Sequence, residues 1–371
     1  MNEVRLGVIG CGGMARNHMR LYPEVPRLRF AAASDIFAPN LQAVVNEYGV
    51  KGFDSAEAMM ESGEIDAVFI ATPHYFHPRF SIAAMRRNLH VLTEKPVAVT
   101  AKAAAEVNAV HQKHKHLVYG AMFQMRAMPR WQKVKELLTS GELGEIYRVH
   151  WTATKWFRSQ TYYNSGSWRA TWAGEGGGVL MNQCPHNLDM FVWLTGVPSR
   201  VTSLVRLGRY HEIEVEDEVT SLLEYPSGAS GVFICSTGEA PGTDRLEILG
   251  DRGRLIVDVA SPNTIEFYQT AQSVREYGRT TQSRMGEPES QRRLIESGQV
   301  HGHRAITENF VEAILDGTPL FANGEEGLDS VELANAMLMS GLLNRPIDIP
   351  TDREAFDRLL QELIEKSKVK V

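Results

Sequence analysis

Two side chains in this sequence are suited to moving a proton away from a substrate hydroxyl group. Lys95 follows a short apolar run, and Pro96 directly after it restricts the backbone, so its ammonium group can be held in a fixed place. His186 carries an imidazole, which titrates near neutral pH and can act as a general base. We assign the base to His186 and the stabilisation of the developing alkoxide to Lys95, with the roles exchanged if Lys95 loses its proton. The alternatives are a surface lysine after an edge strand and a histidine that only begins a helix.

The start of the chain carries a nucleotide-binding pattern that fits such chemistry. An apolar strand pattern over Arg5–Ile9 leads into a turn and then into a helical pattern. The turn residues are, in order, Gly10, Cys11, Gly12, Gly13, Met14 and Ala15. In a G-x-G-x-x-A turn the first glycine permits the tight bend, the second lets backbone approach a pyrophosphate, and the alanine keeps helix and strand close. A glycine-rich structural turn is the alternative.

Asp35 bears on which dinucleotide this turn would hold. It ends the second expected strand, 20 residues beyond Ala15. A carboxylate there accepts hydrogen bonds from an adenosine ribose and repels a 2′-phosphate. The pattern predicts NAD as cofactor rather than NADP, unless Asp35 is only a solvated turn residue.

Two further strand ends carry polar residues of interest. The junctions read Ala71-Thr72-Pro73-His74-Tyr75-Phe76-His77 and Thr93-Glu94-Lys95-Pro96. Ligands of open α/β sheets bind at the carboxyl ends of parallel strands. We therefore add Thr72, Pro73, His77 and Glu94 to the expected cofactor site, although helix capping or packing is the stronger reading of His77.

The elements that must position these residues fall into two regions. Residues 1 to about 121 alternate short apolar runs with amphipathic stretches, which is typical of βαβ units around a parallel sheet. The expected strands are Arg5–Ile9, Leu28–Ser34, Lys51–Phe53, Asp66–Ala71, His90–Thr93 and Leu117–Ala121. Six strands with five crossovers predict a complete Rossmann unit, a doubly wound parallel sheet.

After Arg126 the pattern changes to alternating segments joined by turns, which predicts a second, mostly antiparallel sheet. The expected strands include Ile146–Thr154, Val219–Glu224, Gly231–Cys235, Leu246–Leu249 and Arg254–Val257. The expected helices are Arg130–Ser140, Ala305–Asp316, Glu326–Leu343 and Arg353–Lys366. The segment Gln272–Val300 is polar and lacks periodicity, so we expect a long loop or arm that is mobile or packed on a neighbouring subunit.

Together these pieces resemble the Gfo/Idh/MocA family of glucose-fructose oxidoreductases, inositol dehydrogenases and rhizopine catabolism proteins. The likeness rests on the Gly10–Ala15 turn, Ala71-Thr72-Pro73 with His77, Glu94-Lys95-Pro96, Gly176-Gly177-Gly178 leading to His186 and Asp189, and Phe310, Ala313 and Gly317. It implies an NAD-binding Rossmann domain over 1–124 and an α/β domain with a large open sheet over 125–371. It also implies that the second domain binds the substrate and that the protein forms homodimers or homotetramers.

The resemblance also implies roles for individual residues. In the family, the lysine of the tripeptide touches substrate and nicotinamide, which places this role on Lys95. An aspartate four residues before a histidine completes the family site, and here the histidine is His186 while the aspartate position is Asn182. An amide can orient a hydroxyl or an imidazole, but it brings no charge. Cys184 and Pro185 replace smaller residues common before the histidine, so we expect the surroundings of His186 to differ from those in inositol dehydrogenases.

Aromatic and arginine residues gather between Trp156 and Trp172. Aromatic faces pack against the C–H faces of pyranose or cyclitol rings, and arginine and tyrosine hydrogen-bond their hydroxyls. The residues assigned to substrate binding are Arg158, Tyr163, Trp168, Arg169 and, with helix capping as the leading alternative, Asp189. A loop anchored by aromatic core contacts is the alternative for the aromatic residues. The stretch is also similar to that of family members acting on levoglucosan or on the 3-hydroxyl of glucosides.

Composition indicates the class of protein, its partners and its cellular compartment. With 43% hydrophobic and 23% charged residues the chain is of globular type, and a net charge of -6 argues against a nucleic-acid partner. Cys11, Cys184 and Cys235 form no CxxC pair, which predicts a reducing compartment and no metal site. We see neither a signal peptide nor an apolar stretch of about 18 residues, so we expect no membrane partner and a cytoplasmic location.

These features together predict an NAD-dependent dehydrogenase that oxidises a secondary hydroxyl of a sugar, an anhydrosugar or glucoside, or an inositol. Three alternatives stay open on the same fold: a redox-neutral NAD-dependent glycosidase, a keto-sugar reductase and a nucleotide-binding sugar sensor. A sensor needs no base, so the presence of both Lys95 and His186 weighs against it.

Overall fold

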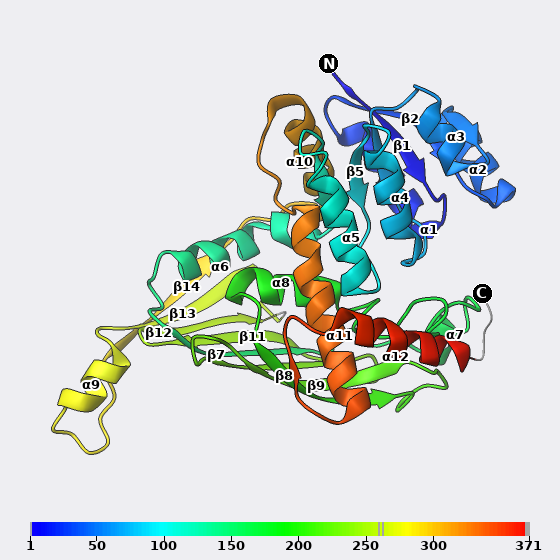
Figure 1. The fold of residues 1–371 in the computed structure, drawn as a ribbon. Coiled ribbons are helices and arrows are strands. Elements are labelled where there is room, and N and C mark those ends of the chain that lie inside the picture. The colour runs from blue at the N-terminus through cyan, green and yellow to red at the C-terminus, as the bar shows by residue number, and fades with distance from the viewer. Residues whose placement is uncertain (1, 259, 262, 368–371) are drawn as a thin grey trace.

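The N-terminal part of the computed structural model folds around a six-stranded sheet, in the upper lobe of Figure 1. The structure describes residues 2–258, 260, 261 and 263–367. The strands are β1 (Val4–Ile9), β2 (Leu28–Ser34), β3 (Lys51–Phe53), β4 (Ala67–Ile70), β5 (His90–Thr93) and β6 (Tyr119–Ala121). All neighbouring strands pair in parallel, in the order β3-β2-β1-β4-β5-β6. This is the doubly wound Rossmann order, and the predicted fold class is confirmed.

The described part of this lobe has six helical segments, and the sequence supplies caps for three of them. The six are α1 (Gly13–Met19), η1 (Tyr22–Glu24), α2 (Ala38–Tyr48), α3 (Ala56–Glu61), α4 (Phe76–Met85) and α5 (Ala101–His111). Pro39 stands in the first turn of α2, and Gly49 ends that helix in the left-handed region at φ 67°. The side chains of Ser55 and Thr100 accept hydrogen bonds from the first turns of α3 and α5.

The second lobe holds a nine-stranded sheet in the order β14-β13-β12-β11-β7-β10-β9-β8-β15. Its strands are β7 (Ile146–Ala153), β8 (Arg200–Leu207), β9 (Glu216–Glu224), β10 (Ser230–Ser236), β11 (Asp244–Gly250), β12 (Gly253–Asp258), β13 (Thr264–Thr270), β14 (Ser290–Glu296) and β15 (Ile347–Asp348). β7 and β10 pair in parallel, and every other neighbouring pair is antiparallel. The mostly antiparallel sheet predicted for this region is therefore confirmed.

Helices cover one face of this sheet and link it to the first lobe (Figure 1). The helices of this part of the chain are η2 (Gln124–Ala127), α6 (Pro129–Thr139), α7 (Gln160–Tyr163), α8 (Pro185–Thr195), α9 (Val274–Thr280), α10 (Gly302–Asp316), η3 (Gly324–Glu326), α11 (Gly327–Leu343) and α12 (Arg353–Glu365), of which α9 lies away from that face (Figure 1). From α10, Ile306, Phe310 and Val311 join the apolar core of the Rossmann lobe. The chain thus returns to the first lobe after building the second, which fixes the two sheets against each other. The division at residue 124 stays a prediction, and residues 1 and 371 that bound it lie outside the described part.

The long loop expected over Gln272–Val300 is wrong, whereas the alternative of a projecting arm agrees with the structure (Figure 1). This segment contains α9, which projects from one end of the sheet, and β14, which pairs with β13 at the sheet edge. All residues of β14 but Ile295 are exposed, so the strand lacks the alternation of apolar and polar residues by which a half-buried strand is predicted.

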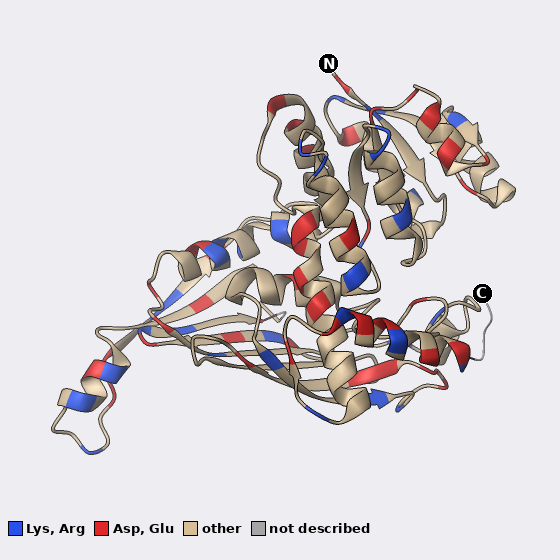
Figure 2. Cartoon of the chain, viewed as in Figure 1, with Lys and Arg blue, Asp and Glu red and all other residues tan. Residues whose placement is uncertain are grey.

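Over the described parts of the chain, neither lobe is dominated by charge of one sign (Figure 2). Figure 2 shows acidic and basic residues interspersed along the ribbon of each lobe, including the tip that carries α9. Within the described residues, no helix is long and apolar enough to cross a membrane.

Candidate active site

The predicted phosphate turn lies between β1 and α1 at the carboxyl edge of the parallel sheet. Gly10 has φ +94°, and a Cβ there would lie 2.6 Å from the carbonyl oxygen of Ala71, so only glycine fits. A Cβ built on Gly12 or Gly13 meets nothing within 4 Å, which leaves open space before the first turn of the helix. Met14 beside it is 50% exposed. This geometry suits the approach of a pyrophosphate to the backbone.

Asp35 joins the ends of β1 and β2 at this turn. One carboxylate oxygen accepts a hydrogen bond from the Cys11 amide at 2.7 Å, and the other accepts from the Phe37 amide at 2.8 Å. The next two side chains, Ile36 and Phe37, are 98% and 57% exposed. An apolar surface therefore flanks the carboxylate, as a nucleoside with a flat base and a polar ribose requires. Sequence analysis missed these two residues, although their place directly after Asp35 was a signal.

The junction after β4 carries Thr72, Pro73 and His77. Pro73 is exposed at the sheet edge, and the buried hydroxyl of Thr72 has no partner among the described residues. His77 is buried, with its two ring nitrogens 2.7 Å from the carbonyl oxygens of Pro96 and Thr72. Through these contacts His77 joins the loop after β4 to the loop after β5. They favour the packing alternative for His77.

Glu94 fixes the backbone at the end of β5. Its Oε1 lies 2.7 Å from Nε2 of His18, and its Oε2 accepts a hydrogen bond from the Lys95 amide at 3.0 Å. Burial raises the pKa of Glu94, but the hydrogen bond and charge of His18 outweigh it and lower that pKa to about 2. Glu94 is therefore an ionised, buried carboxylate that orients the residue next to it.

Lys95 and His186 come together where the two lobes meet. The Lys95 ammonium donates a hydrogen bond to the main-chain carbonyl of Asn182 at 2.8 Å. His186 stands in the first turn of α8, 8% exposed, with Nε2 3.1 Å from the amide nitrogen of Gln124. Burial and the charge of Lys95 hold the pKa of His186 well below its ordinary value, and burial lowers the pKa of Lys95. A neutral imidazole beside a cationic amine can remove one proton and stabilise an alkoxide.

Glu175 is a site residue that sequence analysis missed. Its Oε1 accepts a hydrogen bond from the side-chain amide of Asn182, and its Oε2 accepts from the Ala170 amide at 2.6 Å. The residue is 2% exposed, and Nη1 of Arg169 lies 3.9 Å from its Oε1. Burial raises the pKa of Glu175. An acidic residue between glycines was the available signal.

The glycine run after Glu175 explains how these residues reach the site. A Cβ on Gly176, whose φ is +76°, would lie 2.2 Å from a Val99 methyl carbon. A Cβ on Gly178 would lie 1.9 Å from the carbonyl oxygen of Glu216, whose carboxylate accepts hydrogen bonds from the Gly178 and Leu180 amides at 2.8 and 3.0 Å. The segment fits between the two lobes only without side chains, which brings Asn182 next to Lys95.

Arg158, Trp168 and Arg169 form a partly exposed wall around Tyr162. The guanidinium carbons of Arg158 and Arg169 lie 5.0 and 4.8 Å from the centre of the Tyr162 ring. Arg169 also stacks on Trp168 at 4.6 Å and donates a hydrogen bond to the Tyr162 hydroxyl at 3.1 Å. The structure thus brings three of the five expected substrate residues together.

The other two, Tyr163 and Asp189, are buried rather than exposed on this wall, although the centre of the Tyr163 ring lies 5.2 Å from that of Tyr162. Tyr163 is 5% exposed, and its hydroxyl donates a hydrogen bond to Thr237 at 2.8 Å. Asp189 is fully buried, and both carboxylate oxygens accept hydrogen bonds from Arg126 at 2.9 and 2.6 Å. Their polar atoms are satisfied in the core, so we no longer assign them to substrate binding.

Several buried polar atoms around Lys95 and His186 lack hydrogen-bond partners among the described residues. They are Thr72 Oγ1, Gln124 Oε1, Gln183 Oε1 and His186 Nδ1. Buried polar atoms are almost always paired, and a ligand bound beside Lys95 and His186 would supply partners for such atoms. Gln124 and Gln183 were not predicted, because an isolated glutamine carries no pattern in the sequence.

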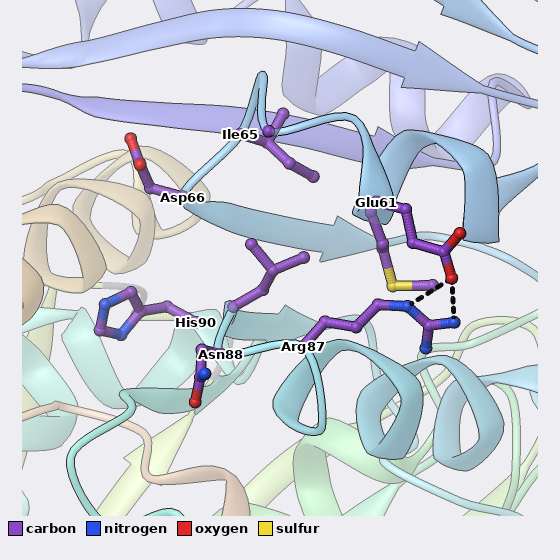
Figure 3. A pocket seen from close by; sticks show the side chains of 9 residues that line it. Glu61, Ile65, Asp66, Arg87, Asn88 and His90 are labelled. Carbon is purple, nitrogen blue, oxygen red and sulfur yellow. Dashed lines mark hydrogen bonds and ion pairs between the residues drawn. The ribbon is translucent and has the colours of Figure 1, made fainter.

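A hollow at the opposite edge of the Rossmann sheet is a weaker candidate (Figure 3). It is lined by Met60, Glu61, Gly63, Ile65, Asp66, Arg87, Asn88, Leu89 and His90. Its charged groups are already paired, Arg87 with Glu61 at 2.6 Å and Asp66 with Arg5 at 2.6 Å. It opens at the amino ends of β4 and β5, away from the edge where parallel sheets bind ligands.

Comparison with known proteins gives the family. Residues 4–121 match the model of an oxidoreductase family with an NAD-binding Rossmann fold, and residues 131–256 match the GFO/IDH/MocA C-terminal domain. The rhizopine catabolism protein MocA of Rhizobium meliloti is 34% identical over 198 residues, which span 53% of this chain and 58% of that relative. Inositol 2-dehydrogenase of Rhizobium meliloti is 25% identical, covering 93% of this chain and 99% of that relative.

A solved structure agrees over nearly the whole chain. The WlbA dehydrogenase of Chromobacterium violaceum, in complex with NADH and UDP-GlcNAcA, matches with a TM-score of 0.82 and 28% identity. The match covers 95% of this chain and 97% of that one. The two family models together match more than half of the chain, one on each lobe. The chain therefore belongs to the Gfo/Idh/MocA family of oxidoreductases, and its N-terminal part is an NAD-binding Rossmann domain.

Proposed function

We propose that the protein is an NAD-dependent dehydrogenase that oxidises a secondary hydroxyl of a sugar, an anhydrosugar or glucoside, or an inositol. The observation that carries this proposal is the meeting of Lys95, which is partly buried and follows a strand of the Rossmann sheet, with buried His186 in the first turn of α8. Two relatives, an inositol 2-dehydrogenase and a dehydrogenase solved in complex with NADH and UDP-GlcNAcA, support a polyhydroxylated ring as the substrate class. A homodimer or homotetramer and a cytoplasmic location stay predictions.

The residues at the sheet edge fit NAD from one end to the other. The pyrophosphate would lie on the Gly10, Gly12, Gly13 and Met14 backbone, and the adenosine ribose would bond to Asp35. Thr72, Pro73, Glu94 and Lys95 would surround the nicotinamide, whose ring accepts a hydride when the cofactor is bound. The unpaired Thr72 hydroxyl and the open space before Gly12 support this fit.

The protein's own residues would then handle the hydroxyl proton. The substrate hydroxyl would lie between Lys95 and His186, so that its proton passes to the imidazole as a hydride leaves the same carbon and a carbonyl forms. The Lys95 ammonium, which has donors left after its bond to Asn182, would stabilise the negative charge that develops on oxygen.

The orientation of the Gln124 side-chain amide decides which ring nitrogen of His186 is free to accept the proton. Amide oxygen and nitrogen are assigned from their hydrogen bonds, and Gln124 Oε1 and His186 Nδ1 both lack partners among the described residues. If the Gln124 amide is turned so that its oxygen accepts from His186 Nε2–H, then Nδ1 holds the lone pair. One rotation therefore pairs the amide oxygen and leaves His186 Nδ1 free as the base.

Turnover assays with purified protein test this function. NADH formation would be followed with NAD or NADP and a panel of inositols, aldoses, levoglucosan and alkyl glucosides. We expect NADH to form with one structural class of polyol and a clear preference for NAD. No NADH with any of them, while calorimetry shows intact NAD binding, would overturn the proposal. Cleavage of a nitrophenyl glycoside without NADH accumulation would identify a redox-neutral glycosidase instead.

A further inference from the structure

We propose that Glu175 is a positioning residue for this reaction, which acts through Asn182 to orient and electrostatically support Lys95. The inference rests on the proposed function, because it concerns the same ammonium group. Residue 175 belongs neither to the cofactor turn nor to the substrate wall, so neither of these features explains why it is a carboxylate.

The contacts form one line across the meeting point of the lobes. The Glu175 carboxylate accepts a hydrogen bond from the Asn182 side-chain amide, and the main-chain carbonyl of Asn182 accepts one from Lys95 at 2.8 Å. Asn182 therefore uses its side chain toward the carboxylate and its backbone toward the ammonium. The Ala170 amide holds the second carboxylate oxygen at 2.6 Å, so Glu175 itself is fixed.

The negative charge of Glu175 acts on two cations, Arg169 and Lys95. Glu94 also raises the pKa of Lys95, but its oxygens are already engaged by His18 and by the Lys95 amide. Arg169 is 3.9 Å from Glu175, which is too far for a hydrogen bond. The ionisable groups that influence or contact Glu175 and Lys95 are His74, His77, Glu94, Arg158, Tyr163, Arg169, Cys184, His186 and His303.

An amide would fill the same space as the Glu175 carboxylate at a lower free-energy cost of burial. Glu175 is 2% exposed, and burying a carboxylate costs more than burying an amide that makes similar hydrogen bonds. A glutamine could still accept from the Ala170 amide and contact Asn182. The property that a glutamine lacks is negative charge, which favours the ammonium form of Lys95.

The test compares Glu175→Gln with the double variant Glu175→Gln/Asn182→Asp. The double variant restores a negative charge, now on residue 182, which stands between Glu175 and Lys95 in the line of hydrogen bonds. On the alkaline side of the profile we expect Glu175→Gln to lower kcat about tenfold, the factor that a fall of one unit in the pKa of Lys95 gives there, with unchanged NAD affinity. The alkaline limb of the kcat profile should move to lower pH, because Lys95 loses its proton more easily. The double variant should regain part of kcat and move the limb back. Glu212→Gln, at an exposed position, is the matched control and should behave as wild type.

NMR titration of Lys95 separates this inference from the proposed function. The lysine nitrogen signal, assigned with Lys95→Ala, reports the pKa without any substrate. A lower Lys95 pKa in Glu175→Gln, reversed in the double variant, would support the inference even if the substrate panel is silent. Wild-type pKa and wild-type kcat in folded Glu175→Gln, or a double variant no better than the single one, would overturn it while leaving the dehydrogenase reading intact.

Discussion

The Lys95 ammonium and the main-chain carbonyl of Asn182 lie 2.8 Å apart, on opposite lobes of the molecule. One residue follows a strand of the Rossmann sheet, and the other precedes α8 on the second sheet. The site is therefore complete only when the lobes are packed together. His186, one turn beyond Asn182, shares that dependence, and the predictions below follow from this arrangement.

Lys95→Ala should lower kcat by about 100- to 1,000-fold, as expected when a group that stabilises an oxyanion is removed. The affinity for NAD should change little, because the pyrophosphate and ribose contacts lie elsewhere on the sheet edge. Steady-state kinetics and calorimetry measure the two effects separately. Lys113→Ala on an exposed turn is a control with the same change in charge. Wild-type turnover in Lys95→Ala would contradict the site assignment.

His186→Ala should lower kcat by about 100- to 10,000-fold, the range for loss of a general base. Loss of packing alone would instead reduce stability and cofactor binding together with turnover. Thermal unfolding of the NAD-bound protein, measured beside kcat, distinguishes the two. If a stable, NAD-binding His186→Ala protein turns over at the wild-type rate, His186 is not the base.

The pH profile of kcat follows from the directions of two pKa shifts. Burial and Lys95 lower the pKa of His186 from 6.5, and a base works only when unprotonated, so the acid limb should lie below pH 6.5. Burial lowers the pKa of Lys95 from 10.5, so activity that needs its ammonium form should fall at a pH below 10.5. An acid limb that persists unchanged in His186→Ala would argue against this assignment.

Asp35→Ala should weaken NAD binding about tenfold to a hundredfold, because a charge-assisted hydrogen bond to the ribose is lost. Discrimination against NADP should relax, since the repulsion of a 2′-phosphate is removed as well. Calorimetry with both dinucleotides gives the ratio of affinities. Asp54→Ala, at an exposed position nearby, serves as the control. An unchanged ratio of the NAD and NADP dissociation constants would count against the role of Asp35.

Tyr163→Phe tests the reassignment of a predicted substrate contact to the core. The lost hydrogen bond to Thr237 should reduce the free energy of unfolding by about 1 kcal/mol, with KM and kcat near wild type. Denaturant unfolding and steady-state kinetics measure these quantities. A tenfold rise in KM at unchanged stability would return Tyr163 to the substrate site.

The Rossmann half of the fold could be read closely from the sequence, because buried parallel strands and capped helices leave strong local patterns. β2, β3 and β5 have the expected bounds, and the other strands differ from them by at most two residues at an end. The edge strand β14 could not be predicted, since it is exposed on both faces. Hydropathy patterns report burial, and such a strand has almost none.

The site was predictable only in part, for a related physical reason. Lys95 and Asp35 stand at strand ends, where the topology dictates a shared edge. Glu175 reaches Asn182 through a turn of glycines whose path depends on contacts with the other lobe. Tyr163 lies in the core and its neighbour Tyr162 lies in the substrate wall. The sequence does not indicate which of the two tyrosines is buried.

Deuterium transfer tests the central claim most directly. A substrate found active in the panel would be prepared with deuterium on the carbon that bears the oxidised hydroxyl, and the NADH formed would be analysed by mass spectrometry and NMR. Direct hydride transfer beside Lys95 and His186 predicts one deuterium at C4 of the nicotinamide for each keto product formed. Keto product that forms while the deuterium appears in water, with none in the cofactor, would contradict the account.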